Sequence, residues 1–154
     1  MIENTEEKAV IRALWDYFMQ CPVMAAGKIN VDYLPAECRG ADVEYSIDTT
    51  PATRIVKRYT NGDSIRQYLF VVRLLTDYTS DVLQNIANCG LFEALAEWLD
   101  EQPRAGMLPA LPAGMKPQVI EAQSTGYLFA TGPTEGKYQI QCRLQYFQEV
   151  KNYG

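Results

Sequence analysis

The stretch "TNGDSIRQYLFVVRLLTDY", from Thr60 to Tyr78, decides the fold of this chain. Asn61-Gly62 in front of an apolar run is the strongest short-range hairpin signal in the sequence, and it predicts a type I′ turn. The run that follows loses its polar and apolar alternation, because "YLFVV" has no side suited to water. The sequence therefore predicts a long strand that needs cover on both of its faces.

Alternation along a strand assigns the apolar side chains of this run to two faces. Leu69, Val71 and Leu75 fall on one face. The other face is the candidate subunit interface, formed by Tyr68, Phe70, Val72, Leu74 and Tyr78. One face of the strand can pack on helices through Trp15 and Trp98. The second face needs another layer, supplied by the same chain or by a neighbouring subunit, and we expect the neighbour.

Two helices and further strands are predicted around this hairpin. Residues 6–20 carry an apolar stripe at helical spacing, formed by Val10, Ile11, Leu14, Trp15 and Phe18. Residues 79–101 predict a second helix, in which Gly90 favours a break or a close packing contact. Period-two patterns predict three short strands, at 28–35, 41–51 and 54–60, and a final hairpin of 118–131 with 137–150.

The expected element order is therefore α-β-β-β-β-α-β-β. Helices are too few for a doubly wound parallel sheet, so the fold class is α+β, a mostly antiparallel sheet with two helices packed on it. The length of 154 residues predicts one domain over 1–154. Residues 103–117 are rich in proline and predict an extended connector, and residues 151–154 predict a frayed tail.

Composition excludes several function classes. The net charge is -5 and no dense Lys/Arg cluster exists beyond "RIVKR", so a general nucleic-acid groove is not expected. The N-terminus does not resemble a signal peptide, and no apolar run approaches the roughly 20 residues that span a bilayer. The absence of histidine removes Ser-His-Asp and Cys-His catalysis and the usual imidazole zinc sites.

The remaining reactive side chains favour structural roles. The four cysteines are far apart and show no CxxC spacing, which favours plain thiols. Asp42, Glu44 and Asp48 alternate on one strand face, where we expect solvated carboxylates rather than a metal site. The same interpretation applies to the helical acidic set, Glu93, Glu97, Asp100 and Glu101. We expect no catalytic residue, cofactor or metal, and the ten tyrosines fit strand packing or an interface about equally.

Three segments in order carry a family resemblance, and they cover roughly Arg54 to Val150. They are "RIVKRYTNGDSIRQYLFVVRLLTDYTSDVLQNIANCGLFEALAEWL", "LPALPAGMKPQVIEAQSTGYLF" and "KYQIQCRLQYFQEV". Together they resemble small phage and prophage proteins of Gram-positive bacteria, encoded among head-tail genes and labelled minor capsid or tail proteins. This family is similar to the tail terminator, or tail completion, proteins of long-tailed phages.

The resemblance implies a structural virion protein with an α+β fold, without catalysis, cofactor or membrane. It implies a hexameric ring of copies that caps the tail tube and meets both the tail-tube protein and the head connector protein. The location would be the tail or neck of the virion, after assembly in the host cytoplasm. A neck protein of similar fold stays open beside the terminator. A small cytoplasmic α+β enzyme or ligand-binding domain is the alternative from another class.

Overall fold

The computed structural model describes residues 5–25, 28–34, 43–77, 82–131 and 135–150. Two α-helices, one short 3-10 helix and seven strands follow one another along the chain. Their bounds are α1 Thr5–Met19, η1 Pro22–Met24, β1 Lys28–Val31, β2 Val43–Thr49, β3 Ile55–Arg58, β4 Ser64–Asp77, α2 Val82–Arg104, β5 Met115–Ala122, β6 Tyr127–Thr131 and β7 Glu135–Gln148. The α+β prediction is confirmed, with one more strand than expected.

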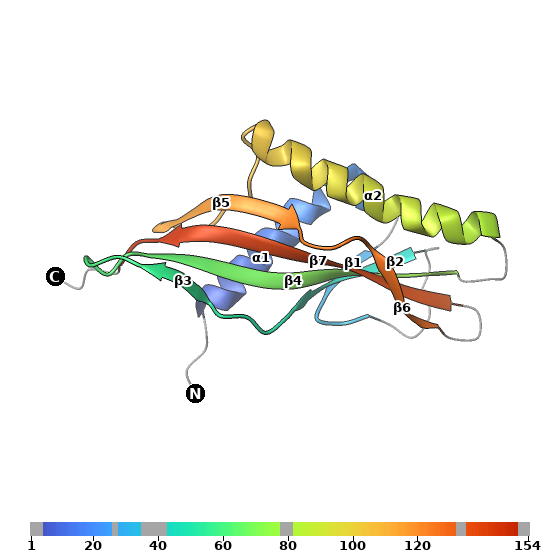
Figure 1. Cartoon of the computed structure of the whole chain (residues 1–154), viewed down its shortest axis with the longest axis horizontal. Helices are drawn as coiled ribbons and strands as arrows, with labels where there is room; N and C mark the ends of the chain where they lie inside the picture. The colour runs from blue at the N-terminus through green and yellow to red at the C-terminus, as the bar shows by residue number, and fades with distance from the viewer. Residues whose placement is uncertain (1–4, 26–27, 35–42, 78–81, 132–134, 151–154) are drawn as a thin grey trace.

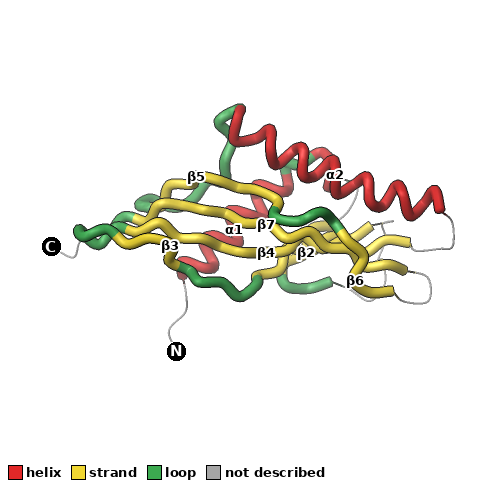
Figure 2. Tube along the Cα trace, viewed as in Figure 1, coloured by secondary structure: helices red, strands yellow, loops and turns green. Residues whose placement is uncertain are grey.

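All seven strands belong to one sheet, whose main order is β1-β2-β4-β7-β5 (Figures 1 and 2). The two 14-residue strands, β4 and β7, pair along their whole length in the centre of the sheet. On one side β4 pairs first with β3 and then with β2, and on the other side β7 pairs with β6 and then with β5. Only β1 and β2 run parallel, so the sheet is otherwise antiparallel.

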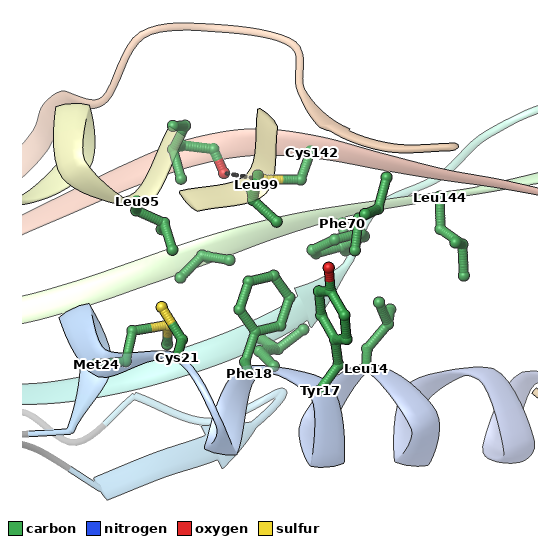
Figure 3. Close-up of a cluster of buried hydrophobic side chains, with 14 of the residues drawn as sticks. Leu14, Tyr17, Phe18, Cys21, Met24, Phe70, Leu95, Leu99, Cys142 and Leu144 are labelled. Carbon is green, nitrogen blue, oxygen red and sulfur yellow. Dashed lines mark hydrogen bonds between the residues drawn. The ribbon is translucent and has the colours of Figure 1, made fainter. Parts of the chain in front are cut away.

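Both helices contribute to one hydrophobic core on a single face of the sheet (Figure 3). Val10, Leu14 and Phe18 of α1 are buried, as the helical stripe predicted. The ring of Phe18 meets that of Phe70 edge-on at 5.9 Å and also packs against Trp98 of α2. The strand β7 adds its inward set, which is Tyr138, Ile140, Cys142, Leu144 and Tyr146. The two helices cover one face of the sheet, as expected, but the covered face is the one that contains Phe70, which we expected a neighbouring subunit to cover.

The hairpin between β3 and β4 forms, but with a different turn from the one predicted. Gly62 has a positive φ of 98°, whereas Asn61 does not, so the type I′ conformation is excluded. The Gly62 amide donates to the Tyr59 carbonyl, and the Tyr59 amide donates to the Asp63 carbonyl. A three-residue loop with a left-handed glycine at its end therefore replaces the two-residue turn. The Asn61 side chain accepts from the Asp63 amide and stabilises this longer loop.

The helix α2 extends further than expected and takes the first residues of the predicted 103–117 connector. Pro103 lies inside its last turn, and Gly106 ends it with a φ of 77°. The Met107 amide donates to the Gln102 carbonyl and the Gly106 amide to the Pro103 carbonyl, which is a Schellman cap. The helix is continuous through Gly90, where a Cβ would meet nothing within 4 Å, so the expected break or close contact is wrong.

The predicted strand over 118–131 is two strands. β5 already begins at Met115, and Pro117 fits because β5 is an edge strand with a bulge between Pro117 and Val119. The chain leaves β7 after Ala122 and returns as β6 at Tyr127. All three of the earlier strands are shorter than predicted, β1 because Asp32 takes a left-handed φ of 50°. The expected tail at 151–154 lies outside the described part of the chain.

Candidate assembly surfaces

The predicted subunit interface on β4 is wrong, because this face lies in the core of the same chain. Phe70 is 1% exposed, and Tyr68, Val72 and Leu74 are buried with it beneath α1 and α2. Because the helices already bury these four side chains, none of them is left on the surface for a neighbour. Tyr78, the fifth residue of the set, lies outside the described residues.

The opposite face of β2 is also buried, although its polar side chains predicted contact with water. Glu44 is 1% exposed, and Ser46 and Asp48 are buried beside it. Asn30 of β1 donates from its amide nitrogen to Glu44 at 3.4 Å and to the Tyr45 carbonyl at 3.0 Å. The expected solvated carboxylates are therefore wrong for Glu44 and Asp48, while Asp42 lies outside the described range. Burial of these groups is tolerated because hydrogen bonds accompany it.

Arg73 of β4 connects this buried polar group to the far edge of the sheet. Its guanidinium forms an ion pair with Asp48, with an N–O distance of 2.8 Å. The Nε of Arg73 also donates to the side chain of Gln139 at 3.3 Å, and Gln139 is hydrogen-bonded to the Tyr127 hydroxyl. The guanidinium carbon lies 5.2 Å from the ring centre of Phe129. Side chains from β2, β4, β7 and β6 are thus joined across one face of the sheet.

The strand β6 is the most exposed apolar strand in the sheet. All five of its residues are exposed, and Tyr127, Leu128 and Phe129 each keep 38 to 39% of their surface in contact with solvent. Within the described residues β6 pairs with β7 alone, so its outer edge is open. An open edge with adjacent apolar side chains is a template for contact with another chain. The run "YLF" from Tyr127 to Phe129 is the sequence signal for this exposure, because three successive apolar residues in a strand place at least one on each face.

A groove of about 450 Å³ separates α2 from the connector between β5 and β6, and we call it the α2 groove. Phe92, Ala96 and Ile140 supply its apolar wall, and Glu93 and Asp100 add two carboxylates from α2. The connector wall is formed by Gln123, Ser124, Thr125 and Gly126. Gly126 is required at this place, because a Cβ there would lie 2.4 Å from the Phe92 ring. The groove is continuous along the chain with the exposed strand β6, which starts at the next residue.

A second hollow of about 400 Å³ lies where β2 gives way to β3 along β4. The loop 50–54 departs from the sheet there, so that Gln67, Tyr68 and Leu69 are approached from the side. Gln67 donates from its backbone to the Arg54 carbonyl and from its side chain to the Thr53 carbonyl. The loop is therefore held to β4 at this hollow.

Burial raises the pKa of thiol and phenol groups in the core. Desolvation raises the pKa of Cys142 and of Cys21 above the usual thiol range, which disfavours a nucleophilic thiolate. Desolvation likewise raises the pKa of Tyr45 to about 12, and its hydroxyl donates to the Val23 carbonyl at 3.3 Å. These groups serve packing, as the spacing of the cysteines predicted for Cys21 and Cys142. Cys38 and the side chain of Cys89 lie outside the described residues.

Two absences hold for the described ranges of the chain. No three cysteine, aspartate or glutamate side chains gather there in a way that suits a metal ion. Among the same residues, neither helix combines the length and the apolar character that a bilayer crossing requires.

Comparison with known proteins gives no argument about the role of this chain. No family model matches the sequence, and no curated protein matches it. One solved structure, of a protein whose name states no function, is similar over 99% of both chains, with a TM-score of 0.49 and 13% sequence identity. A likeness of this degree carries no argument about what the chain does.

Proposed function

We propose that the chain is a structural component of a phage or prophage virion, of the tail terminator class, that works by contact with other protein chains. The observation that carries the proposal is the open strand β6. Its exposed Tyr127, Leu128 and Phe129 lie together on an unpaired sheet edge, which is costly in water unless a partner covers it. The sequence resemblance over 54–150 supplies the kind of partner. The partners are further copies of the chain, the tail-tube protein and the head connector protein.

The way in which β6 is held supports an interaction role. Arg73 lies over Phe129, and Gln139 holds the Tyr127 hydroxyl, so the exposed rings are fixed in place before any partner arrives. A side chain that is ordered in the free protein loses less conformational entropy on binding. Arg73 is in turn anchored by its ion pair with the buried Asp48. The edge is therefore a preorganised contact surface rather than a frayed strand.

Substitution of Leu128 by lysine tests this role. A charge on an edge strand opposes pairing with another chain, while the half-exposed position tolerates the change in the free protein. We expect Leu128→Lys to lose ring particles in electron microscopy and native mass spectrometry, and to lose co-sedimentation with tail tubes of the encoding phage. Met19→Lys is the matched control, because Met19 is 54% exposed at the end of α1. Far-UV circular dichroism of both variants should match the wild-type protein.

The proposal fails if the wild-type protein forms no rings and does not bind tail tubes. The assignment of the contact to β6 fails if Leu128→Lys forms rings and binds tail tubes to the same extent as Met19→Lys. A neck protein would instead bind the connector and not the tube, so the two purified partners separate the terminator from that alternative. A ligand-binding domain would remain monomeric with every partner.

A further inference from the structure

Two chemically complementary surfaces lie at opposite lateral edges of the sheet. The α2 groove lies on the side of β5, against which α2 packs. The strand β3 lies on the other side, where it pairs with β4 and leaves its outer edge open among the described strands. Figure 1 shows α2 above the sheet, whereas β3 forms the lower margin of the sheet at the end nearer the C-terminus. One molecule therefore cannot bring its own β3 into its own groove.

The α2 groove is acidic at its rim and apolar inside. Glu93 and Asp100 line it, and Glu97 and Glu101 are exposed on the same helix. None of these four carboxylates forms an ion pair with another residue of the described ranges. The apolar wall includes Phe92, which is buried against Tyr138 with ring centres 6.3 Å apart. A partner that fits must bring both cations and apolar side chains.

The strand β3 and the residue after it offer that combination. Lys57 and Arg58 are exposed, and Val56 and Tyr59 keep 50% and 39% of their surface in water. Lys57 lies 5.0 Å from the ring centre of Tyr59, which holds the cation beside an aromatic surface. Neither cation forms an ion pair with a residue that the structure describes. We call Val56 to Tyr59 the β3 edge.

We propose that the β3 edge of one copy docks along the α2 groove of the next copy. The lengths are comparable, because the three steps from Val56 to Tyr59 span about 10 Å along a strand and the eight steps from Glu93 to Glu101 rise about 12 Å along the helix. Lys57 and Arg58 lie on opposite faces of β3, so their long side chains reach the carboxylates of α2 from the two sides of the docked strand, and Val56 enters the apolar part of the groove. The inference rests on the proposed ring-forming function and names the surfaces that join neighbouring copies.

The contact is head-to-tail, since the two surfaces differ. Each copy uses its β3 edge toward one neighbour and its α2 groove toward the other, so that repetition closes a ring or extends a filament. The strand β6 begins beside the groove and stays available to the tube or connector. Because charges contribute to the contact, added salt weakens it by screening.

Charge reversal on each surface tests the contact. The first variant is Lys57→Glu with Arg58→Glu, and the second is Glu93→Lys with Asp100→Lys. Each replaces attraction by repulsion, and we expect self-association in sedimentation velocity at low salt to weaken by roughly tenfold to a hundredfold. An equimolar mixture of the two variants should associate again, since every β3 edge then meets a groove of opposite charge. Arg12→Glu with Lys28→Glu is the control, with the same change in net charge as the first variant, made on α1 and β1.

The outcomes separate the contact from the proposed function. The proposed contact is overturned if either variant associates as the wild-type protein does, or if only the control loses association. It is also overturned if the wild-type protein stays monomeric at high concentration. A groove variant that self-associates normally but no longer binds tail tubes overturns it as well, because the groove would then receive the tube. Loss in both variants with recovery in the mixture supports the contact. If that pattern occurs while the wild-type protein forms open filaments and ignores tail tubes, the contact holds and the terminator function fails.

Discussion

Replacement of Phe70 by alanine is the sharpest test of which face of β4 is the core. Phe70 is 1% exposed and its ring packs against Phe18 at 5.9 Å and Tyr68 at 6.3 Å between ring centres. Loss of a buried phenylalanine side chain costs about 3–5 kcal/mol, which includes the cavity that it leaves. That is a large part of the roughly 5–15 kcal/mol by which a domain of this kind is stable. We therefore expect Phe70→Ala to lower the free energy of unfolding by about 3–5 kcal/mol.

The matched comparison is Phe129→Ala on β6. Phe129 is 38% exposed and its ring lies beneath the Arg73 guanidinium. An exposed cation–π contact contributes about 0.5–1 kcal/mol, so Phe129→Ala should lower the free energy of unfolding by no more than about 1 kcal/mol. The two substitutions remove the same ring, and the predicted difference comes mainly from the greater burial of Phe70.

Urea unfolding followed by tryptophan fluorescence measures both values by linear extrapolation. Phe70→Leu keeps most of the side-chain volume and should cost less than about 1.5 kcal/mol, so it yields a measurable value if Phe70→Ala does not fold. The reasoning is refuted if Phe70→Ala lowers the free energy of unfolding by less than Phe129→Ala does, while the Phe70→Ala protein no longer self-associates. That result would return the Phe70 face to the role of a subunit interface.

Three further substitutions have outcomes set by local geometry. Gly126→Ala places a Cβ 2.4 Å from the Phe92 ring and should lower the thermal midpoint through overpacking that costs about 1–3 kcal/mol. Gly90→Ala meets nothing within 4 Å in a helix interior and should raise the unfolding free energy by up to about 1 kcal/mol; a decrease would contradict the open space around it. Burial raises the pKa of Tyr45 from 10.0 to about 12, so the folded protein keeps a proton that the unfolded chain releases. Stability is therefore unaffected by this group below pH 10 and falls as pH rises toward 12, and Tyr45→Phe should flatten that fall in unfolding experiments across the range.

Local patterns predicted most of the elements because their signals are strong over short distances. The α1 stripe, the inward set of β7 and the hairpin before β4 all follow from spacing that one element decides. Boundaries were less accurate where a cap or a bulge decides them. The Schellman cap at Gly106 ends α2 beyond Pro103, and the bulge after Pro117 lets β5 begin early on an edge of the sheet.

The candidate surfaces were less predictable, because exposure depends on which segments meet. Period-two alternation showed that β4 has two apolar faces but not which face the helices take. Glu44 and Asp48 looked like solvated groups, and only the neighbours Asn30 and Arg73 reveal a buried polar layer. The exposure of β6 depends on its position at the end of the sheet, which no short window of sequence contains.

The sequence by itself determined the α+β class, the long strand β4 that follows the hairpin turn, and the apolar stripe of α1. These features are local, because backbone propensity and hydrophobic period act over short stretches of chain. Only the tertiary structure decided that the Phe70 face is core and that β6, β3 and the α2 groove lie at the edges. The reason is physical: burial is a property of pairs of surfaces, so a strand cannot be assigned to the core or an interface until its partners are in place.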